Sequence, residues 1–344
     1  MREEQRVSIS VRDVAERAGV SLGTVSNVLN APEKVASATT GRVLAAIEEL
    51  GFVRNDAARQ LRAGSSRSIG MIVLDVGNPF FTDLARGAED RARRSGLSVL
   101  LADARQAGDR ESGYLDLFEE HRVRGVLITP VEDSVPRLLR LRSHGIPSVL
   151  VDRLASSSGF SSVSMDDVAG GRLATEHLLE TGRRHLLFVG GPLHLRQVRD
   201  RLEGARAAVA AVPGAVLEVL EIPALTMLEG VSAGKALLQR EQRPDAVFAA
   251  NDLVALGVLQ GVGILGGLRV PEDVALVGYD DIEFAAAAAV PITSVRQPRE
   301  RMGSEAVDLL LAEIDGAAVR RRIVFQPELV VRESSVPRSQ DGAP

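Results

Sequence analysis

The stretch that decides the fold of the N-terminal part runs Val11-Arg12-Asp13-Val14-Ala15-Glu16-Arg17-Ala18-Gly19-Val20-Ser21 and continues as Leu22-Gly23-Thr24-Val25-Ser26-Asn27-Val28-Leu29-Asn30. The pattern predicts a short helix, a glycine turn and a second short helix capped by Ser21. Two helices joined in this way can place the second one in the major groove of DNA. The rest of the chain is therefore interpreted as possible control machinery for a DNA-binding head.

A third helix completes this head. Val43, Leu44, Ile47 and Leu50 recur at helical spacing, which predicts a helix over residues 39–50 that Gly51 ends. A polar segment over residues 54–68 follows and has the composition of a linker.

From Ile69 onward the pattern changes to short β-branched runs that alternate with amphipathic helical stretches. Near-continuous apolar runs separated by helices are typical of parallel strands buried on both faces. The number of runs favours two doubly wound α/β lobes over a single sheet. The predicted strands cover residues 69–74, 98–102, 125–128, 148–151, 186–189, 246–249 and 274–277.

The net charge of -5 does not by itself indicate nucleic-acid binding. Residues 1–67, however, hold ten basic and eight acidic side chains, a net charge of +2, and Arg59, Arg62 and Arg67 form a basic cluster at their end. A basic cluster beside a groove-binding helix is the expected electrostatic footprint, although a solvated face is the commoner explanation.

Several classes of protein are excluded by composition. The absence of cysteine excludes disulfides and thiolate metal sites and fits an intracellular location. No secretory signal is expected from the charged first residues, and no run approaches the ~20 apolar residues that a membrane helix needs. We expect a cytoplasmic protein with no membrane partner, no cofactor and no bound metal.

Polar residues stand at the ends of the predicted strands. Because parallel α/β sheets bind ligands beyond the carboxyl ends of their strands, this set predicts a cleft for a polar small molecule. The alternative for any single residue is a helix cap or a turn. The set comprises Asp75, Asp103, Thr129, Asp152, Arg153, Asn251, Asp252, Tyr279, Asp280 and Asp281.

Two signatures, in the right order, resemble the LacI family of bacterial transcription regulators. The resemblance covers about residues 8–335, and it implies a homodimer that binds double-stranded operator DNA, most often as a repressor. It also implies a small-molecule effector, bound between two doubly wound parallel-sheet lobes of the periplasmic-binding-protein type. The matching motifs are Asp13-Val14-Ala15, Ala18-Gly19-Val20-Ser21, Thr24-Val25-Ser26 and Asn30 in the head, and Gly190-Gly191-Pro192-Leu193, Ala250-Asn251-Asp252, Ala255-Leu256-Gly257, Val270-Pro271-Glu272-Asp273-Val274 and Gly278-Tyr279-Asp280-Asp281 in the core.

The resemblance divides the chain into four parts. Residues 8–52 are expected to form a small all-α helix-turn-helix DNA-binding domain, and residues 53–67 a hinge helix and linker. The two-lobed core for effector binding and dimerisation is expected over residues 68–336, and a disordered tail over residues 337–344.

In the head, Leu22, Gly23 and Asn27 match the base-contacting positions of the family. The Asn27 amide can donate and accept together, as adenine N6 and N7 require, and a solvent-facing helix residue is the alternative. Gly23 lacks the longer polar side chain often found there, so one base contact is expected to be missing. Ser21 is the cap, and the phosphate-contacting positions are matched by Ser10, Thr24, Ser26, Asn30, Lys34 and Thr39.

The third helix departs from the family pattern at its start. Ala36 stands where a capping Ser is usual, and Thr40-Gly41 replaces a more helix-favouring pair. Because Gly inside a helix costs ~1 kcal/mol relative to Ala, the head is expected to be less stable than its relatives.

Residues 55–63 resemble the family's hinge helix, with Ala58 and Leu61 at the matching positions. In such regulators paired hinge helices enter the minor groove, where a Leu from each opens the central base step. The polar surroundings of Leu61 offer no apolar face to bury it, which favours this role over core packing.

Residues at the strand ends match the family's sugar-binding positions. Asn78 is implied to bind a hydroxyl, Phe80 and Phe81 to stack on the ring, and Asp152 with Arg153 to bind neighbouring hydroxyls. Core packing is the alternative for the two aromatics. The remaining matches are Arg201, Asn251, Asp280 and Gln297.

The identity of the ligand stays open. Leu225 stands roughly where many relatives place an aromatic over the sugar ring, and a pentose or sugar alcohol is favoured over a nucleoside or purine. The Gly-x-Gly-x-x-Gly run over residues 261–266 follows a predicted helix instead of a strand, so it is interpreted as a helix end and not as a dinucleotide site.

Competing functions are a transport solute-binding protein and an enzyme. The DNA-binding head argues against the first. The absence of a nucleophile elbow and the scattered histidines argue against the second. Residues 336–344 are too short and polar for a heptad bundle, so we expect a dimer and no tetramer. Whether the ligand releases or recruits the regulator is left open.

Overall fold

The computed structural model describes residues 9–52, 66–131, 134–155, 159–317 and 320–336. The chain divides into two compact units, Met1–Ser65 and Ser66–Pro344. We call the first the head and the second the core. The core begins two residues before its predicted start because Ser66 is buried there and Arg67 donates from Nε to the carbonyl of Gly96. The predicted tail and hinge helix, including Ala58 and Leu61, lie outside the described residues.

The head consists of α1 (Val11–Ala18), α2 (Leu22–Asn30), a 3-10 turn (Pro32–Lys34) and α3 (Ser37–Leu50). Ser10 and Asp13 form a capping box at the start of α1, and Gly19 ends this helix with φ of 63°. Ser21 caps α2 by accepting the N–H of Thr24 at 3.1 Å, as predicted. These caps fix the turn between the two helices.

The head has a small core of its own, to which each helix contributes a fully buried valine: Val14, Val25 and Val43. The third helix begins at Ser37, two residues earlier than predicted, and its cap residue Ala36 makes no side-chain hydrogen bond. Leu44, part of the apolar pattern, is 53% exposed, and Ala46 is buried in the head core instead.

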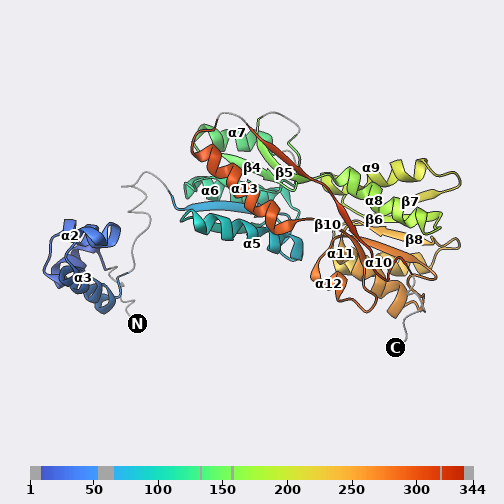
Figure 1. Cartoon of the computed structure of the whole chain (residues 1–344), viewed down its shortest axis with the longest axis horizontal. Coiled ribbons are helices and arrows are strands. Elements are labelled where there is room, and N and C mark those ends of the chain that lie inside the picture. The colour runs from blue at the N-terminus through green and yellow to red at the C-terminus, as the bar shows by residue number, and fades with distance from the viewer. Residues whose placement is uncertain (1–8, 53–65, 132–133, 156–158, 318–319, 337–344) are drawn as a thin grey trace, which may run out of the picture. The chain divides into compact units, whose positions relative to one another are not determined.

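The N-terminal lobe of the core is a parallel sheet with strand order β11-β5-β4-β3-β1-β2 (Figure 1). Helices α5 and α13 pack on each other, while α6 and α7 follow β2 and β3. The strands are β1 (Ser68–Val73), β2 (Ser98–Asp103), β3 (Val126–Ile128), β4 (Ser148–Val151), β5 (Ser161–Met165) and β11 (Arg322–Phe325), and the helices are α5 (Pro79–Arg94), α6 (Gly108–Glu120), α7 (Val135–Ser143) and α13 (Arg299–Ile314).

The C-terminal lobe repeats this plan with strand order β12-β10-β9-β8-β6-β7, in which only the pairing of β10 with β12 is antiparallel among the described strands. Its strands are β6 (His185–Gly190), β7 (Val216–Glu221), β8 (Ala246–Ala249), β9 (Ala275–Asp280), β10 (Thr293–Arg296) and β12 (Glu328–Val330). Its helices are α8 (Asp167–Glu180), α9 (Arg196–Ala210), α10 (Met227–Leu238), α11 (Asp252–Leu259), which continues as a π-helical turn (Gln260–Ile264), and α12 (Glu283–Ala286).

The lobes are interwoven by the chain. Within the described residues the chain passes between them after β5, after β10 and after β11. In Figure 1 the last of these passages is the long red segment that joins β11 to β12 across the core. Helix α13 therefore belongs to the N-terminal lobe although it follows β10 of the other.

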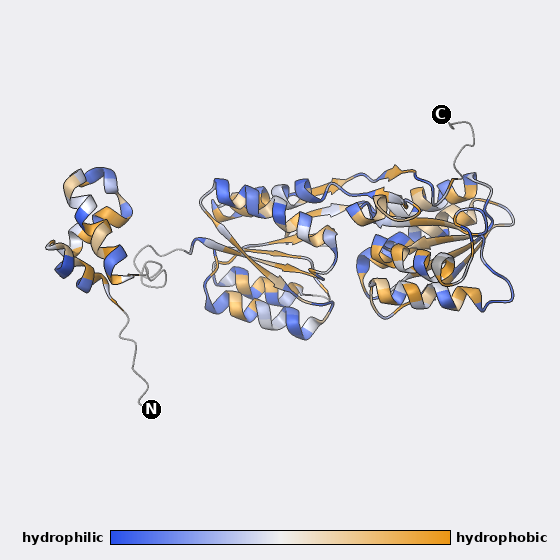
Figure 2. Ribbon diagram, turned by 90° about the horizontal axis from the view of Figure 1, so that it is seen from below, coloured by the Kyte–Doolittle hydropathy of each residue, from blue (hydrophilic) through white to orange (hydrophobic). Residues whose placement is uncertain are grey.

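Five of the described strands were not predicted from the apolar pattern because their sequences contain polar residues: β5, β7, β10, β11 and β12. β5 is a buried strand built from serines, and β7 repeats Val-Leu-Glu at a sheet edge. β10, β11 and β12 also carry polar residues. One predicted burial was wrong, because β2 is an edge strand that exposes Leu100 and Leu101. Figure 2 shows the apolar strands inside each lobe and polar residues on the outer helix faces.

The glycine run over residues 261–266 ends a helix, as predicted. Gly261 packs against Gly234 of α10, and a Cβ at Gly257 would lie 2.1 Å from the carbonyl oxygen of Met227. These glycines let α10 and α11 approach at backbone distance. In the part of the chain that is described, no helix has the length and apolarity to cross a bilayer.

Candidate functional site

A cavity lies between the two lobes of the core, at the ends of their strands, where open α/β sheets bind small ligands. The N-terminal lobe supplies residues that follow β1, β2 and β4, and the C-terminal lobe supplies residues from α9 and from the ends of β8 and β9. We call this the effector cavity; it is lined by Leu74, Asp75, Asn78, Phe80, Phe81, Gln106, Asp152, Leu195, Gln197, Val198, Arg201, Leu225, Asn251 and Asp280.

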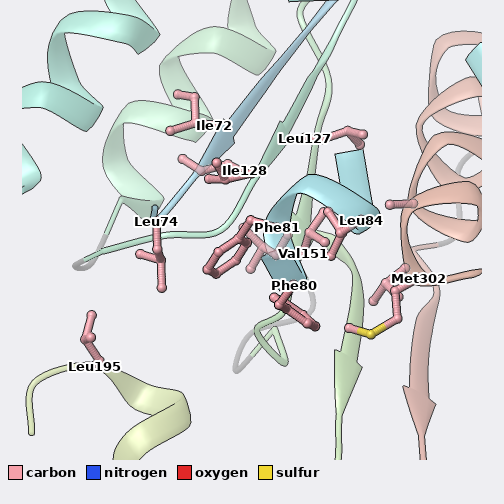
Figure 3. Close-up of a cluster of buried hydrophobic side chains, with 14 of the residues drawn as sticks. Ile72, Leu74, Phe80, Phe81, Leu84, Leu127, Ile128, Val151, Leu195 and Met302 are labelled. Carbon is pink, nitrogen blue, oxygen red and sulfur yellow. The ribbon is translucent and has the colours of Figure 1, made fainter. Parts of the chain in front are cut away.

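The first turn of α5 forms an aromatic wall. Asn78 caps this helix by accepting the N–H of Phe80 at 3.0 Å, and Pro79 occupies its first position. The rings of Phe80 and Phe81 meet edge to face with centroids 4.9 Å apart. Figure 3 shows both rings beside Leu84 in the N-terminal lobe, and Leu195 of the other lobe opposite Leu74. The two aromatics thus pack in the core and line the cavity at once.

Asp152 is a buried carboxylate at the end of β4. Its Oδ2 accepts a hydrogen bond from Nε2 of Gln197 at 3.0 Å, whereas its Oδ1 has no partner among the described residues. Burial, reinforced by the nearby Asp167 carboxylate, raises the pKa of Asp152 to about 8, against the opposing effects of Arg201 and Gln197. This side chain therefore carries a proton more readily than an ordinary aspartate.

Arg201 is fixed in the wall of the cavity by α8 and β8. Its Nε donates to Asp167 at 2.8 Å, its Nη1 donates to the carbonyl of Ala250 at 2.7 Å, and its guanidinium lies 3.7 Å from the centre of the Tyr279 ring. Burial lowers the pKa of Arg201, but the surrounding carboxylates, Asp167 first, outweigh burial and raise it. The guanidinium is therefore a permanent, oriented cation.

Asp280 joins the two lobes at the end of β9. Its Oδ2 accepts from Nδ2 of Asn78 at 3.1 Å, and its Oδ1 accepts from Nε2 of Gln297 at 2.8 Å. Burial raises the pKa of Asp280. Asn251 caps α11 through the N–H of Val254 and donates from Nδ2 to the carbonyl of Leu225 at 3.3 Å.

Backbone strain concentrates at this site. Gln106, Asp152 and Asp280 line the cavity with φ values of 57°, 55° and 106°, in the region that favours glycine. Such conformations cost about 1–3 kcal/mol each and persist where a site holds side chains in fixed directions.

The structure brings most of the sequence-predicted effector residues together. Arg153 is half-buried and is not among the residues that line the cavity, and Gln297 reaches the site through Asp280. The predicted residues that line the cavity are Asn78, Phe80, Phe81, Asp152, Arg201, Asn251 and Asp280.

Sequence reasoning missed Gln106 and Gln197. Gln106 lies three residues beyond β2, where the strand-end rule selects Asp103 instead. Gln197 lies in the first turn of α9, where strand ends give no signal. Leu225, noted as a departure from the family, lines the cavity.

The second candidate site is the outer face of α2 in the head. Leu22, Gly23 and Asn27 are exposed, with Leu22 at 48%, whereas Val25 and Val28 on the opposite face are buried. Asn30 donates from Nδ2 to the carbonyl of Ser26 at 2.8 Å, so these two residues lie together. Ser10 and Lys34 are exposed, and Ser26 and Thr39 are half-buried.

Both parts of the chain match models of known families. Residues 10–55 match the bacterial regulatory proteins of the lacI family, and residues 175–335 match a periplasmic binding protein-like domain. These matches define a DNA-binding transcription regulator with a ligand-binding core. The chain belongs to the lacI family of bacterial regulatory proteins.

Curated relatives match over nearly the whole chain. The ribose operon repressor of Escherichia coli (strain K12) is 33% identical over 329 residues, which cover 95% of this chain and 99% of that protein. The transcriptional repressor PurR of Aliivibrio fischeri (strain MJ11) is 34% identical over 341 residues, 96% of this chain and 99% of that one. Since these relatives are repressors, the regulator hypothesis is confirmed, and the chain is not an enzyme.

Solved structures agree with this assignment. A complex of the regulator CelR with cellobiose has a TM-score of 0.71 at 35% identity and covers 95% of this chain and 99% of its own. The lac repressor dimer bound to operator and an anti-inducer has a TM-score of 0.79 at 28% identity, with the same coverage. A LacI family regulator from Enterococcus faecium with bound ribose has a TM-score of 0.72 at 28% identity and covers 79% of this chain and all of that one.

Proposed function

We propose that this regulator represses transcription as a homodimer on operator DNA, and that a small hydroxyl-rich effector, a pentose or a polyol, controls it from the effector cavity. The observation that carries the proposal is the lining of that cavity. It combines buried acceptor oxygens, an oriented cation and an aromatic wall around one space.

The chemistry of the lining fits hydroxyl groups. Asp152 Oδ1 and Gln106 Oε1 are buried acceptors without a partner among the described residues, so a ligand that donates there satisfies them. Arg201 supplies a fixed donor, and Phe80 and Phe81 supply an apolar surface for a ring face. A hydroxyl both donates and accepts, as this mixed lining requires. The ribose repressor and the ribose-bound regulator among the similar proteins support a sugar.

A purine or nucleoside is the second candidate. The observation in its favour is the sequence identity to PurR, which at 34% is as high as the 33% identity to the ribose operon repressor. A purine offers N–H donors to the same unpartnered oxygens, and its ring can lie on the same aromatic wall.

For the head we propose that α2 enters the major groove. The amide of Asn27 pairs with adenine, and the exposed side chain of Leu22 contacts a thymine methyl. Gly23 adds no side-chain contact. Ser21 caps the helix, and phosphates are contacted by Ser10, Thr24, Ser26, Asn30, Lys34 and Thr39. Ala58 and Leu61 act in the hinge, as the family resemblance implies.

We further propose that the dimer forms through apolar surface that the core leaves exposed. Leu100 and Leu101 are exposed on edge strand β2, and Met227 and Leu228 on α10, with Leu228 at 78%. Exposed apolar side chains on an edge strand or on a helix surface are typical of subunit interfaces. The similar lac repressor structure is a dimer, which supports a dimer here. The binding of effector and the binding of operator are then coupled through two states of the dimer. The protein acts in the cytoplasm, where bacterial operators lie.

The test combines ligand and DNA binding by the full chain. Thermal unfolding is recorded with pentoses, hexoses, polyols, cellobiose, nucleosides and purines, because a ligand that binds only the folded state raises the midpoint. A stabilising ligand is then added to fluorescence-anisotropy titrations with fragments of the promoter. We expect a pentose or polyol to stabilise the protein and to change DNA affinity. Stabilisation by purines alone would select the second candidate, and no promoter binding at low salt would reject the proposal.

The Asn27 contact has its own test in the same titrations. Asn27→Ala should weaken operator binding by roughly 10- to 100-fold, because a bidentate base contact is worth about 1–3 kcal/mol. Glu16→Gln, on the exposed side of α1, should not weaken it. Equal affinities for wild type and Asn27→Ala would remove Asn27 from the base-contacting residues.

A further inference from the structure

Gln197 reaches across the effector cavity from one lobe to the other. It lies in α9 of the C-terminal lobe, and its Nε2 donates a 3.0 Å hydrogen bond to Oδ2 of Asp152 at the end of β4 in the N-terminal lobe. Both side chains are buried and both line the cavity. This contact occupies one of the two side-chain oxygens of Asp152.

The other oxygen of Asp152, Oδ1, is buried and has no partner in the described part of the chain. An aspartate with both oxygens available accepts hydrogen bonds from two neighbouring hydroxyls at once. Here the protein itself supplies one of the two donors. Arg153, which the family resemblance places beside Asp152 at the ligand, is not in the cavity wall, and Gln197 is there instead.

We infer that Gln197 is a specificity-determining residue of the effector site, because it occupies one oxygen of Asp152 from the opposite lobe and leaves that carboxylate a single ligand hydroxyl. The inference rests on the proposed function, namely that the cavity binds a hydroxyl-rich effector. Gln106 offers a matched comparison within the same cavity. Its Oε1 is also a buried acceptor, and no hydrogen bond joins it to Asp152 among the described residues.

The first experiment measures sugar selectivity by calorimetry on the full chain. D-ribose is compared with its 2-deoxy, 3-deoxy and 5-deoxy analogues for wild type, Gln197→Ala and Gln106→Ala. Gln197→Ala frees Oδ2 for a second hydroxyl. Wild type is expected to bind one of the deoxy analogues as well as it binds ribose. The Gln197→Ala variant should bind that analogue about 10-fold more weakly than ribose, because the analogue lacks the hydroxyl that would form the second hydrogen bond with Asp152. Gln106→Ala removes an acceptor from the cavity. The ratio of its affinities for ribose and for each deoxy analogue should therefore fall or stay at the wild-type value.

The second experiment needs no ligand. Asp152 is faced by Asp167 of α8, by Arg201 and Gln197 of α9, and by Asp280 of β9, and the Gln197 hydrogen bond lowers its pKa. Gln197→Ala should therefore raise the pKa of Asp152 further. Between pH 5 and pH 10 the melting midpoint of this variant should fall more than that of wild type, and the difference should vanish when both carry Asp152→Asn. A role in packing alone would shift the midpoint equally at every pH and in both backgrounds.

The outcomes separate the inference from the proposed function. If wild type binds none of the sugars, the proposed effector class is wrong and the inference falls with it. If the sugars bind but Gln197→Ala keeps the wild-type affinity ratios, the inference alone is overturned. It is also overturned if the pH-dependent difference persists in the Asp152→Asn background. Gained discrimination together with a pH effect that depends on Asp152 supports it.

Discussion

Asn78 donates a 3.1 Å hydrogen bond to the carboxylate of Asp280, and this contact joins the N-cap of α5 in one lobe to the end of β9 in the other. Gln297 holds the second oxygen of the same carboxylate. Asn78, Asp152, Gln197 and Asp280 face the cavity and also connect the two lobes. On the proposed function, we therefore expect ligand binding and lobe arrangement to depend on the same groups.

Asp280→Asn should weaken effector binding by roughly 10- to 100-fold. The amide keeps the shape of the side chain but replaces one acceptor oxygen with a donor, so it cannot accept from both Asn78 and Gln297 and still serve a ligand. Calorimetry with a ligand found by the thermal screen measures the effect. Operator binding without ligand is the control, and unchanged effector affinity would show that Asp280 does not serve the ligand.

The free energy of unfolding of the ligand-free protein should depend on pH through Asp152. Its pKa is raised to about 8 in the folded state, so the folded state binds the proton more tightly than the unfolded state does. The stabilising contribution of Asp152 is therefore fully present below the ordinary Asp pKa near 4 and is lost as pH rises toward 8, by at most about 1.4 kcal/mol per pH unit.

Urea titrations between pH 5 and pH 8 check this slope. Asp152→Asn should flatten it, whereas the exposed control Asp109→Asn should leave it unchanged. Equal slopes for wild type and Asp152→Asn would contradict the raised pKa.

Gly257→Ala should destabilise the core by about 1–3 kcal/mol. Its Cβ would lie 2.1 Å from the carbonyl oxygen of Met227, so α10 and α11 would have to move apart. The matched control is Gly113→Ala, in α6, where nothing lies within 4 Å of the new Cβ. That substitution should stabilise by about 0.5–1 kcal/mol because Ala favours the helix. Denaturant midpoints compare the two, and opposite signs are the expected result.

Ala36→Ser should stabilise the head by about 0.5–2 kcal/mol. Ala36 is the N-cap of α3 and makes no side-chain hydrogen bond, and a serine there can accept an N–H of the first turn. Ala38→Ser, within the first turn of the same helix, is the control and should give no gain. The unfolding of the head, followed by hydrogen exchange of the α3 amides in the full chain, measures both.

The sequence predicts an element well where a single physical cause dominates. The Ser21 cap, the Gly19 turn and the buried strands β1, β4 and β8 follow from local chemistry and apolar runs, and the structure shows them as predicted. β5 and β7 could not be found in this way. Serines fill β5, and β7 repeats Val-Leu-Glu without strict alternation, so their burial depends on neighbours that are distant in sequence.

The residues of the candidate site also differ in how well local sequence predicts them. Asp152, Asn251 and Asp280 follow strands and were predictable, and the family resemblance added Arg201 on α9. Gln197 was not predictable, because its significance comes from a contact with Asp152, 45 positions earlier, that only the packing of two lobes creates.

The interwoven connection of the lobes has a consequence for synthesis on the ribosome. In the N-terminal lobe β11 pairs with β5, and α13 packs on α5. This lobe therefore lacks β11 and α13 until translation has passed residue 325. Its earlier strands stay partly uncovered while most of the C-terminal lobe, β6 to β10, is translated. Nascent chains of this regulator should therefore be natural clients of chaperones, and a stalled ribosome would hold two unfinished lobes instead of one finished domain.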